Sequence, residues 1–235
     1  MRTEIIAEIG QNHNGDMELA KTLIHEAKRV GADVAKFQLY EARALFPKEG
    51  NEWFDYNCKT ELSRDQIAML AAECEKAGIE FMASVFDIAR IQWLEDAGMK
   101  RYKIASRSIF ETDLINAVAA TGKPVIVSLG KWDRPGLPDI QAKGGVHYLY
   151  CIAKYPPALD EVHLAKADFS ILAGFSDHTI GTAAPLAAMA RGARIIEKHF
   201  TLDKAMFGPD HAGSATPAEL AQMCAFRDDI EQILS

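Results

Sequence analysis

Two histidines, each following a short apolar run, are the residues in this sequence best placed to bind a metal ion. His178 follows the first run and His199 the second, and the pair Asp210-His211 lies a little further along. An Ala-rich segment over Gly181–Gly192 predicts a helix between the two runs. Since parallel strands joined by a helix end on the same edge of a sheet, both histidines would meet there. Neutral imidazoles can bind Zn, Fe, Mn or Co, with carboxylates and water completing a harder, octahedral shell.

Polar residues close the other apolar runs as well. Two lysines and several hydroxyls at one mouth would hold a phosphate or a carboxylate well. Simpler interpretations exist, because a lysine at a strand end often only extends its ammonium group to solvent and a serine often only caps the next helix. Acid-rich mouths also occur without a metal. The residues in question are Glu8, Lys36, Gln38, Ser84, Lys103, Ser106, Ser128, Tyr155, Ser176 and Glu197.

Eight apolar runs alternate with helical patterns, and these elements must position the polar residues. The predicted strands are Ile5–Ile9, Val34–Leu39, Phe81–Val85, Tyr102–Ala105, Val125–Leu129, Val146–Cys151, Ile171–Phe175 and Ile195–Ile196. Helices are predicted at Met17–Val30, Ser63–Gly78, Asp87–Gly98, Asp113–Ala120, 162–167, Gly181–Gly192 and Pro217–Leu234. Capping signals support four of them: Asp16, the capping box of Ser63 and Gln66, Asp87, and Thr216 before Pro217.

This alternation predicts an α/β fold, a (β/α)8 TIM barrel in which residues 1–235 form a single domain. No Gly-rich dinucleotide turn follows the first strand, which argues against an open doubly wound sheet. Two stretches depart from the repeat. The segment after the fifth strand contains two prolines and three glycines, so no full helix is expected there. The long aromatic connection Tyr40–Leu62 resembles a lid or binding loop.

Composition narrows the class of protein. With 49% hydrophobic and 25% charged residues, the chain is an ordinary globular protein and not a disordered one. A net charge of -7 without a basic stripe argues against a nucleic-acid partner. No apolar segment is long enough for a signal peptide or a membrane span, so a cytoplasmic protein without a membrane partner is expected. Four widely spaced cysteines, with no CxxC pair, are expected to be reduced thiols.

Seven motifs run through almost the whole chain. They are AEIGQNHNG at Ala7–Gly15, KFQ at Lys36–Gln38, KIAS at Lys103–Ser106, GKPVIVS at Gly122–Ser128, GFSDHT at Gly174–Thr179, EKHFTLD at Glu197–Asp203 and GPDH at Gly208–His211. In this order they resemble the sialic acid synthase family, phosphoenolpyruvate-condensing enzymes that make N-acetylneuraminate and related nonulosonates. The pair SDHT and EKHFT is the most specific part of this resemblance.

The resemblance implies an enzyme that joins phosphoenolpyruvate to an open-chain aldose, giving a 2-keto-3-deoxy sugar acid and phosphate. It implies a divalent metal on His178 and His199, manganese before magnesium or cobalt, which polarises the aldehyde as a Lewis acid. It places Glu8, Gln38, Tyr155, Glu197 and Asp210 around the acceptor sugar and the waters on the metal. Glu8 is the preferred proton-handling residue, with Asp210 as the alternative. Phosphoenolpyruvate would be held by Lys36, Ser84, Lys103, Ser106, Ser128 and Ser176.

Departures from the family pattern fall in the acceptor half of the site. After KIAS the family usually continues with Gly and an acidic residue, whereas this chain has Arg107 and Ser108. Arg107 is therefore a candidate for binding an acidic or phosphorylated group of a variant acceptor. Ala153 and Lys154 replace a polar pair before Tyr-Pro. Two further departures are Leu129 for a threonine and Phe207 for a proline.

The resemblance ends with the barrel, and the C-terminal antifreeze-like domain of many family members is not present in this sequence. A homodimer is expected from the association of family barrels. Two other hypotheses compete with the synthase. One is a non-catalytic barrel that binds phosphoenolpyruvate and metal in a regulatory role, and the other is a metal-dependent aldolase or lyase.

Overall fold

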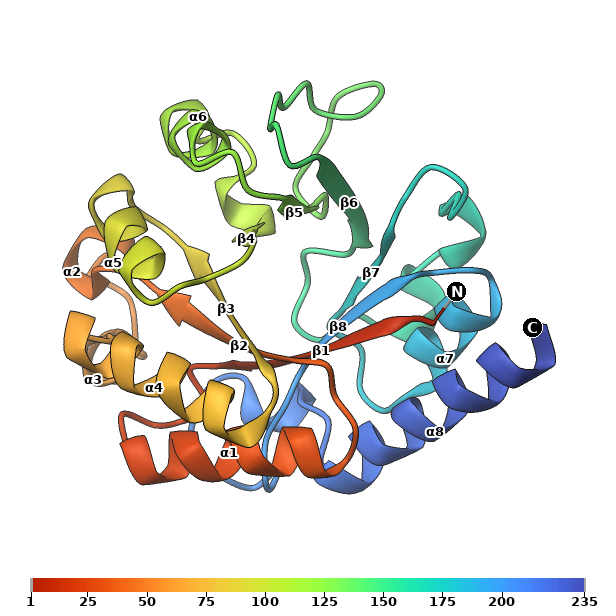
Figure 1. The fold of residues 1–235 in the computed structure, drawn as a ribbon, viewed down its shortest axis with the longest axis horizontal. Helices are drawn as coiled ribbons and strands as arrows, with labels where there is room; N and C mark the ends of the chain where they lie inside the picture. The colour runs from red at the N-terminus through yellow and green to blue at the C-terminus, as the bar shows by residue number, and fades with distance from the viewer. Residues whose placement is uncertain (1, 235) are drawn as a thin grey trace.

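Eight parallel strands close into a barrel, each pairing with the next along the chain and β8 pairing back with β1 (Figure 1). This computed structural model describes residues 2–234. The predicted barrel is confirmed, and the strand ranges of β2 and β6 match the sequence prediction at both ends. The strands are β1 (Glu4–Gly10), β2 (Val34–Leu39), β3 (Glu80–Val85), β4 (Tyr102–Ile104), β5 (Val125–Ser128), β6 (Val146–Cys151), β7 (Gly174–Asp177) and β8 (Ile195–His199).

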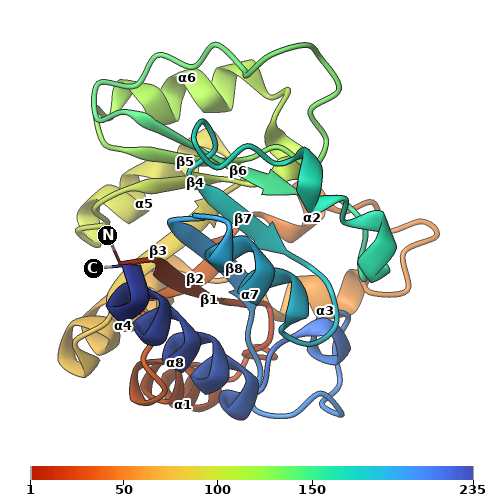
Figure 2. The ribbon, with the colours of Figure 1, turned by 90° about the vertical axis from the view of Figure 1, so that its right-hand side faces the viewer.

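Helices surround the strands. Three of them, α1, α4 and α8, lie side by side along one flank of the barrel (Figures 1 and 2). No helix follows β5, where the chain instead forms the predicted irregular segment. The helices are α1 (Met17–Arg29), α2 (Ala42–Leu45), α3 (Phe54–Lys59), α4 (Arg64–Ala77), α5 (Ile91–Asp96), α6 (Thr112–Ala120), α7 (Ala183–Ala190) and α8 (Pro217–Leu234).

Local sequence explains where the long helices begin. The Asp16 side chain accepts hydrogen bonds from the backbone N–H groups of the first turn of α1. Ser63 and Gln66 form the reciprocal capping box at the start of α4. Helix α1 then buries Leu23 and Ile24 against the sheet, which contributes about 1.5 to 3 kcal/mol for each side chain.

Inside the barrel, an apolar layer lies beneath a polar one. Ile6, Val34, Met82, Ile126, Leu149, Ala173 and Ile195 form a separate buried cluster. Since side chains two residues apart point to the same face of a strand, the next inward positions after Ile6, Val34, Met82, Ile126 and Ile195 carry polar groups. Ile6 is followed in this way by Glu8, and Ile195 by Glu197. The floor of the polar layer is therefore apolar and buried.

The prediction for the seventh strand was wrong at its start. Ile171 is 62% exposed, and β7 begins three residues later at Gly174. The apolar run suggested a strand, but its first residues form a turn before the chain enters the sheet. Smaller differences are the two 3₁₀ turns, Leu159–Glu161 and Leu164–Lys166, in place of a short helix. Two short helices, α2 and α3, also lie within the long aromatic connection.

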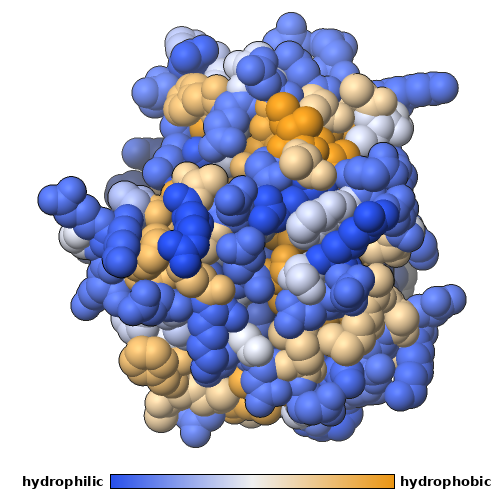
Figure 3. Space-filling view, turned by 90° about the vertical axis from the view of Figure 1, so that its left-hand side faces the viewer, coloured by the Kyte–Doolittle hydropathy of each residue, from blue (hydrophilic) through white to orange (hydrophobic). Residues whose placement is uncertain are grey.

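The outer surface carries no extended apolar face on the side of α2 and α3. Hydrophilic side chains cover most of that face, with small hydrophobic patches between them (Figure 3). Within residues 2–234, no helix combines the length and the apolar character needed to cross a membrane.

Gly174 should be indispensable to the barrel. A Cβ at this position would lie well inside van der Waals contact with the backbone of Ile195 on β8. We expect Gly174→Ala to lower the free energy of unfolding by about 3 kcal/mol or more, the upper end of overpacking costs. Urea denaturation would measure this loss. As a control, Gly213→Ala should change stability by less than about 1 kcal/mol, because a Cβ there meets nothing within 4 Å. Equal effects of the two substitutions would contradict the steric explanation.

Candidate active site

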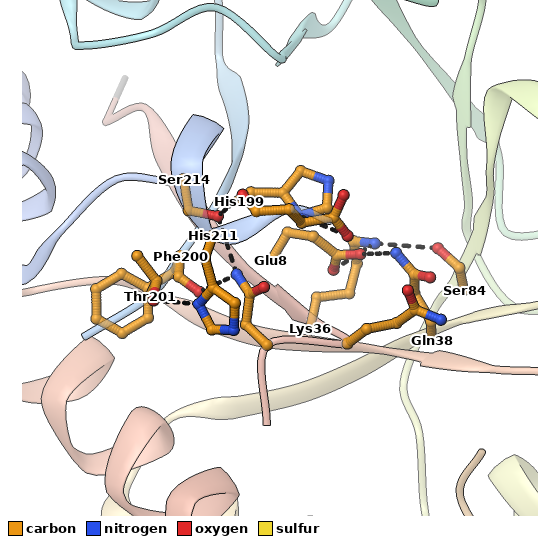
Figure 4. A network of polar contacts seen from close by, with 12 residues as sticks. Glu8, Lys36, Gln38, Ser84, His199, Phe200, Thr201, His211 and Ser214 are labelled. Atoms are coloured by element: carbon orange, nitrogen blue, oxygen red, sulfur yellow. Dashed lines mark hydrogen bonds and ion pairs between the residues drawn. The ribbon is translucent and has the colours of Figure 1, made fainter. Parts of the chain in front are cut away.

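Four buried charges of alternating sign occupy the polar layer of the barrel. Lys36 Nζ lies 2.7 Å from Glu8 Oε2 and 3.4 Å from Glu197 Oε2. Lys103 Nζ lies 3.5 Å from Glu197 Oε1. No member is more than 6% exposed. We call these four residues the charge network; Figure 4 shows its Glu8 and Lys36 side chains pointing toward each other from β1 and β2.

Burial and mutual attraction oppose each other within this network. Burial alone would raise the pKa of Glu197, but Lys103, Lys36 and a hydrogen bond from Ser176 lower it below its ordinary value. Burial would likewise lower the pKa of Lys36, but Glu197 and Glu8 raise it. Lys103 differs, since burial outweighs Glu197 and lowers its pKa. Glu197 and Lys36 are therefore charged at neutral pH.

Serine hydroxyls surround the lysines. Lys36 Nζ donates to Ser84 Oγ at 3.0 Å, and Lys103 Nζ donates to Ser128 Oγ at 2.8 Å. Ser106 Oγ is buried without a hydrogen-bond partner among the residues that the structure describes. All six residues expected to hold phosphoenolpyruvate line one pocket, together with Glu8, Glu197 and both histidines. We call it the deep pocket. The structure thus brings this predicted set together.

The two histidines lie beside each other at the mouth, with ring centroids 5.8 Å apart. His178 Nδ1 is 3.0 Å from the carbonyl oxygen of Ile152, so Nδ1 carries the proton and Nε2 is free to act as a ligand. Burial, together with the neighbouring His199, lowers the pKa of His178 to about 3 and keeps its imidazole neutral. His199 Nδ1 is buried without a hydrogen-bond partner within residues 2–234 and lies 4.0 Å from Asp210 Oδ2.

This arrangement fits a hard divalent ion that takes part of its shell from outside the protein. Within residues 2–234, no three or more His, Cys, Asp and Glu side chains are grouped closely enough to enclose a metal. Two neutral imidazoles would leave positions for water and substrate oxygens, as catalytic metals require. The metal itself stays a prediction.

A hydrogen-bond network links the loop after β1 to the segment after β8 and so supports Asp210 (Figure 4). The Asn12 amide donates to the carbonyl of Phe200 and to Ser214 Oγ, at 2.8 and 2.9 Å. His211 is fully buried between Thr201 Oγ1 and Asn14 Oδ1, at 2.6 and 3.0 Å. The motif residue His211 is therefore a structural link, and its neighbour Asp210 faces the mouth.

Sequence reasoning missed one pair of residues that position the histidines. Lys198 Nζ lies 2.6 Å from Asp177 Oδ2, and both side chains are almost completely buried. Lys198 also donates to the carbonyl of Thr179 at 2.7 Å, so the pair holds the turn that carries His178. Strand alternation turns Asp177 and Lys198 outward, away from the polar layer, so the rule of collecting inward-facing strand ends does not find them. The sequence did contain a signal for this pair, since an acidic residue, Asp177, directly precedes His178 and a basic residue, Lys198, directly precedes His199.

A second, wider pocket of about 460 Å³ opens outside the charge network, and we call it the outer pocket. Gln38, Tyr155, His199 and Asp210 line it on one side, and Phe46 of the aromatic connection lines it as well. Arg107 and Ala153, two of the departures from the family pattern, also face this pocket. Gln38 donates to Glu8 Oε1 at 2.9 Å and so connects the two pockets. Two residues expected around the acceptor, Glu8 and Glu197, lie deeper, in the charge network.

The other departures lie elsewhere. Lys154 Nζ turns to the exposed Glu161, at 2.5 Å. Phe207 is 73% exposed and packs its ring against Trp53 and Tyr56 of the aromatic connection, with centroids 5.4 and 5.9 Å apart. Ser108 is fully buried. Leu129 is half-buried and packs against the core. These four residues do not line either pocket.

Comparisons with known proteins agree with the motifs. The model of the NeuB family matches residues 23–235. An N,N'-diacetyllegionaminic acid synthase of Legionella pneumophila is 34% identical over 258 residues, covering 98% of this chain and 72% of that protein. The human N-acetylneuraminate-9-phosphate synthase is 32% identical, covering 93% of this chain and 67% of that protein. A crystal structure of a sialic acid synthetase from Leptospira borgpetersenii, in complex with citrate, has a TM-score of 0.90 and 31% identity over 100% of this chain and 86% of that one.

Removing one lysine tests how strongly the buried carboxylates of the charge network depend on their positive partners. In Lys36→Met, Glu8 and Glu197 retain only Lys103, and we expect the free energy of unfolding at pH 7 to fall by about 3 to 5 kcal/mol. The deficit should shrink toward pH 5. Lys36 helps to hold the pKa of Glu197 below its ordinary value, so the pKa of this carboxylate is higher in the variant, and the proton that it takes up as the pH falls removes part of the deficit. Urea denaturation at the two pH values measures this.

The double variant Lys36→Met with Glu8→Gln is the matched control. Since it removes one charge of each sign, it should recover part of the lost stability and show a weaker pH dependence. A double variant no more stable than Lys36→Met would show that lost packing, and not charge, dominates.

Proposed function

Since this chain belongs to the NeuB family, whose named relatives are sialic-acid-type synthases, we propose that it condenses phosphoenolpyruvate with an open-chain aldose to give a 2-keto-3-deoxy sugar acid and phosphate. The observation that carries the proposal is the buried pocket in which two lysines, each bonded to a serine hydroxyl, lie beside two histidines. Such a pocket offers cations to an anionic donor and imidazoles to a metal at adjacent positions.

The donor fits the deep pocket chemically. Phosphoenolpyruvate carries a carboxylate and a phosphate, and Lys36 and Lys103 supply one cation for each end. The hydroxyls of Ser84, Ser106, Ser128 and Ser176 can donate to the remaining oxygens. Ser106 is the clearest of these, because its buried hydroxyl has no other partner among the described residues. The donor would thus replace contacts that the lysines now make with serines and carboxylates.

The acceptor would enter through the wider pocket with its aldehyde toward the histidines. A divalent ion on His178 and His199, manganese by preference, would supply Lewis-acid polarisation of the aldehyde oxygen. Tyr155 covers His178 with a ring centroid distance of 4.1 Å and limits the access of water. Gln38 lines both pockets and Asp210 lines the wider one, so both can orient the hydroxyls of the sugar.

The reaction balances with one water molecule. C3 of phosphoenolpyruvate forms a carbon–carbon bond to the aldehyde carbon, and the aldehyde oxygen takes a proton from water. The hydroxide adds to C2, the C2–O bond to phosphate breaks, and the hydroxyl proton leaves with the phosphate. Glu8 is positioned to pass protons in these steps, since Lys36 and Gln38 hold both of its carboxylate oxygens at the boundary of the two pockets.

Phosphate release measures this activity directly. With phosphoenolpyruvate and a panel of aldoses that includes N-acetylmannosamine, we expect phosphate only when an aldose and a divalent metal are both present. Bound phosphoenolpyruvate without consumption would instead favour a regulatory barrel. Pyruvate release from a keto sugar acid without phosphate would favour an aldolase or lyase.

The metal can be tested separately. Removal of metal with a chelator, or the substitution His199→Ala, should lower the rate about a thousandfold or more, because polarisation of the aldehyde is worth several kcal/mol. Added Mn²⁺ should restore the chelated wild type but not the variant. The control is His25→Ala, an exposed histidine paired with Glu73, which should behave as wild type. Full activity after chelation would contradict a metal role for the two histidines.

A further inference from the structure

Two cations face the wide outer pocket on the side opposite His199. Arg107 follows β4 and Lys131 follows β5, and both line this pocket. His199 and Asp210 line it from β8 and the segment after β8. In a closed ring of eight strands, β4 and β5 lie across from β8 and β1. A ligand that fills the pocket therefore spans from His199 to the two cations.

Arg107 is held in place without a counter-charge. Its guanidinium lies over the rings of Phe46 and Phe86, 5.2 and 6.0 Å from their centroids, and it donates to the carbonyl of Leu45 at 3.3 Å. Within residues 2–234, neither Arg107 nor Lys131 forms a salt bridge. By contrast, Arg101, the residue before β4, forms salt bridges with both Glu4 and Glu80. Stacking fixes the plane of a guanidinium but leaves its N–H edges free to bind an anion.

The charges on the two sides of the pocket would orient an anionic ligand. Asp210 on the histidine side repels an anionic group, and the two cations on the opposite side attract it. The uncharged aldehyde end can approach the histidines without this penalty. A forked guanidinium and an ammonium together match the double charge of a phosphomonoester better than the single charge of a carboxylate.

We propose that Arg107 and Lys131 form a phosphate subsite, and that the acceptor is an aldose phosphorylated at the end remote from its aldehyde. This inference rests on the proposed function for the identity of the ligand as an acceptor. Binding energy from this remote group would hold the aldehyde in position for attack.

The kinetic test compares N-acetylmannosamine with its 6-phosphate in wild type and in Arg107→Gln. We expect wild type to prefer the phosphorylated sugar, and Arg107→Gln to lower the ratio of the two kcat/KM values by about tenfold to a hundredfold, the effect of losing one charge-assisted hydrogen bond. Arg107→Lys should retain part of the preference. The control is Arg134→Gln: Arg134 also stacks on aromatic rings, of Phe110 and Trp132, but does not line the pocket, so the ratio should not change.

A binding test separates this inference from the proposed function. The acceptors reduced to their sugar alcohols cannot react, and calorimetry with saturating phosphoenolpyruvate, which blocks the deep pocket, measures their binding outside it. We expect the phosphorylated alcohol to bind wild type at least tenfold more tightly than it binds Arg107→Gln. Equal binding to both proteins, equal binding of the two alcohols to wild type, or no binding of the phosphorylated alcohol would overturn the subsite. If the difference in binding is found but no phosphate is released with any aldose, the subsite stands and the synthase activity fails.

Discussion

The charge network of Glu8, Lys36, Glu197 and Lys103 is the constraint on which the rest of the site depends. Two positive and two negative side chains lie in the interior of the barrel, nearly inaccessible to water. Buried charges of this kind are tolerated only when each has partners, because desolvation costs several kcal/mol per ion. The alternating order meets that condition, and the serines satisfy further donors. The network therefore fixes both lysines before any ligand arrives.

The equal number of acidic and basic side chains in the charge network also affects the binding of an anionic donor. The network is neutral as a set, so a donor carrying several negative charges would add net charge to a poorly solvated space. Additional positive charge close by would offset that cost. The two histidines lie where such a charge could be held, and Arg107 and Lys131 lie further out. Donor binding and metal binding should therefore support each other, since each offsets the charge that the other introduces.

Much of this could be predicted from the sequence, for a physical reason. Strand alternation places Glu8, Lys36 and Ser84 on inward positions, and a parallel barrel brings their strand ends together, so collecting polar residues at strand ends finds the pocket. The capping signals of α1 and α4 are local and were also recovered. The start of β7 was not, because Ile171 is apolar but turns to solvent. Other features could not be predicted, because they depend on strand register and loop conformation, which no local pattern encodes. They are the ion-pair partners within the charge network, the outward pair Asp177 and Lys198, and the neighbours of Arg107.

The residues expected to bind the donor and those that line the outer pocket come from different kinds of structural element. Nearly all contacts expected for the donor come from strands, whose positions are set by backbone pairing and by the apolar layer below them. The residues that line the outer pocket come mainly from loops, including Phe46, Arg107 and Lys131. Loops accept substitutions without disturbing the sheet, whereas a change in the charge network leaves an unpaired buried ion. Chemistry at the donor is therefore tied to the stability of the fold, while the choice of acceptor can vary from one relative to another.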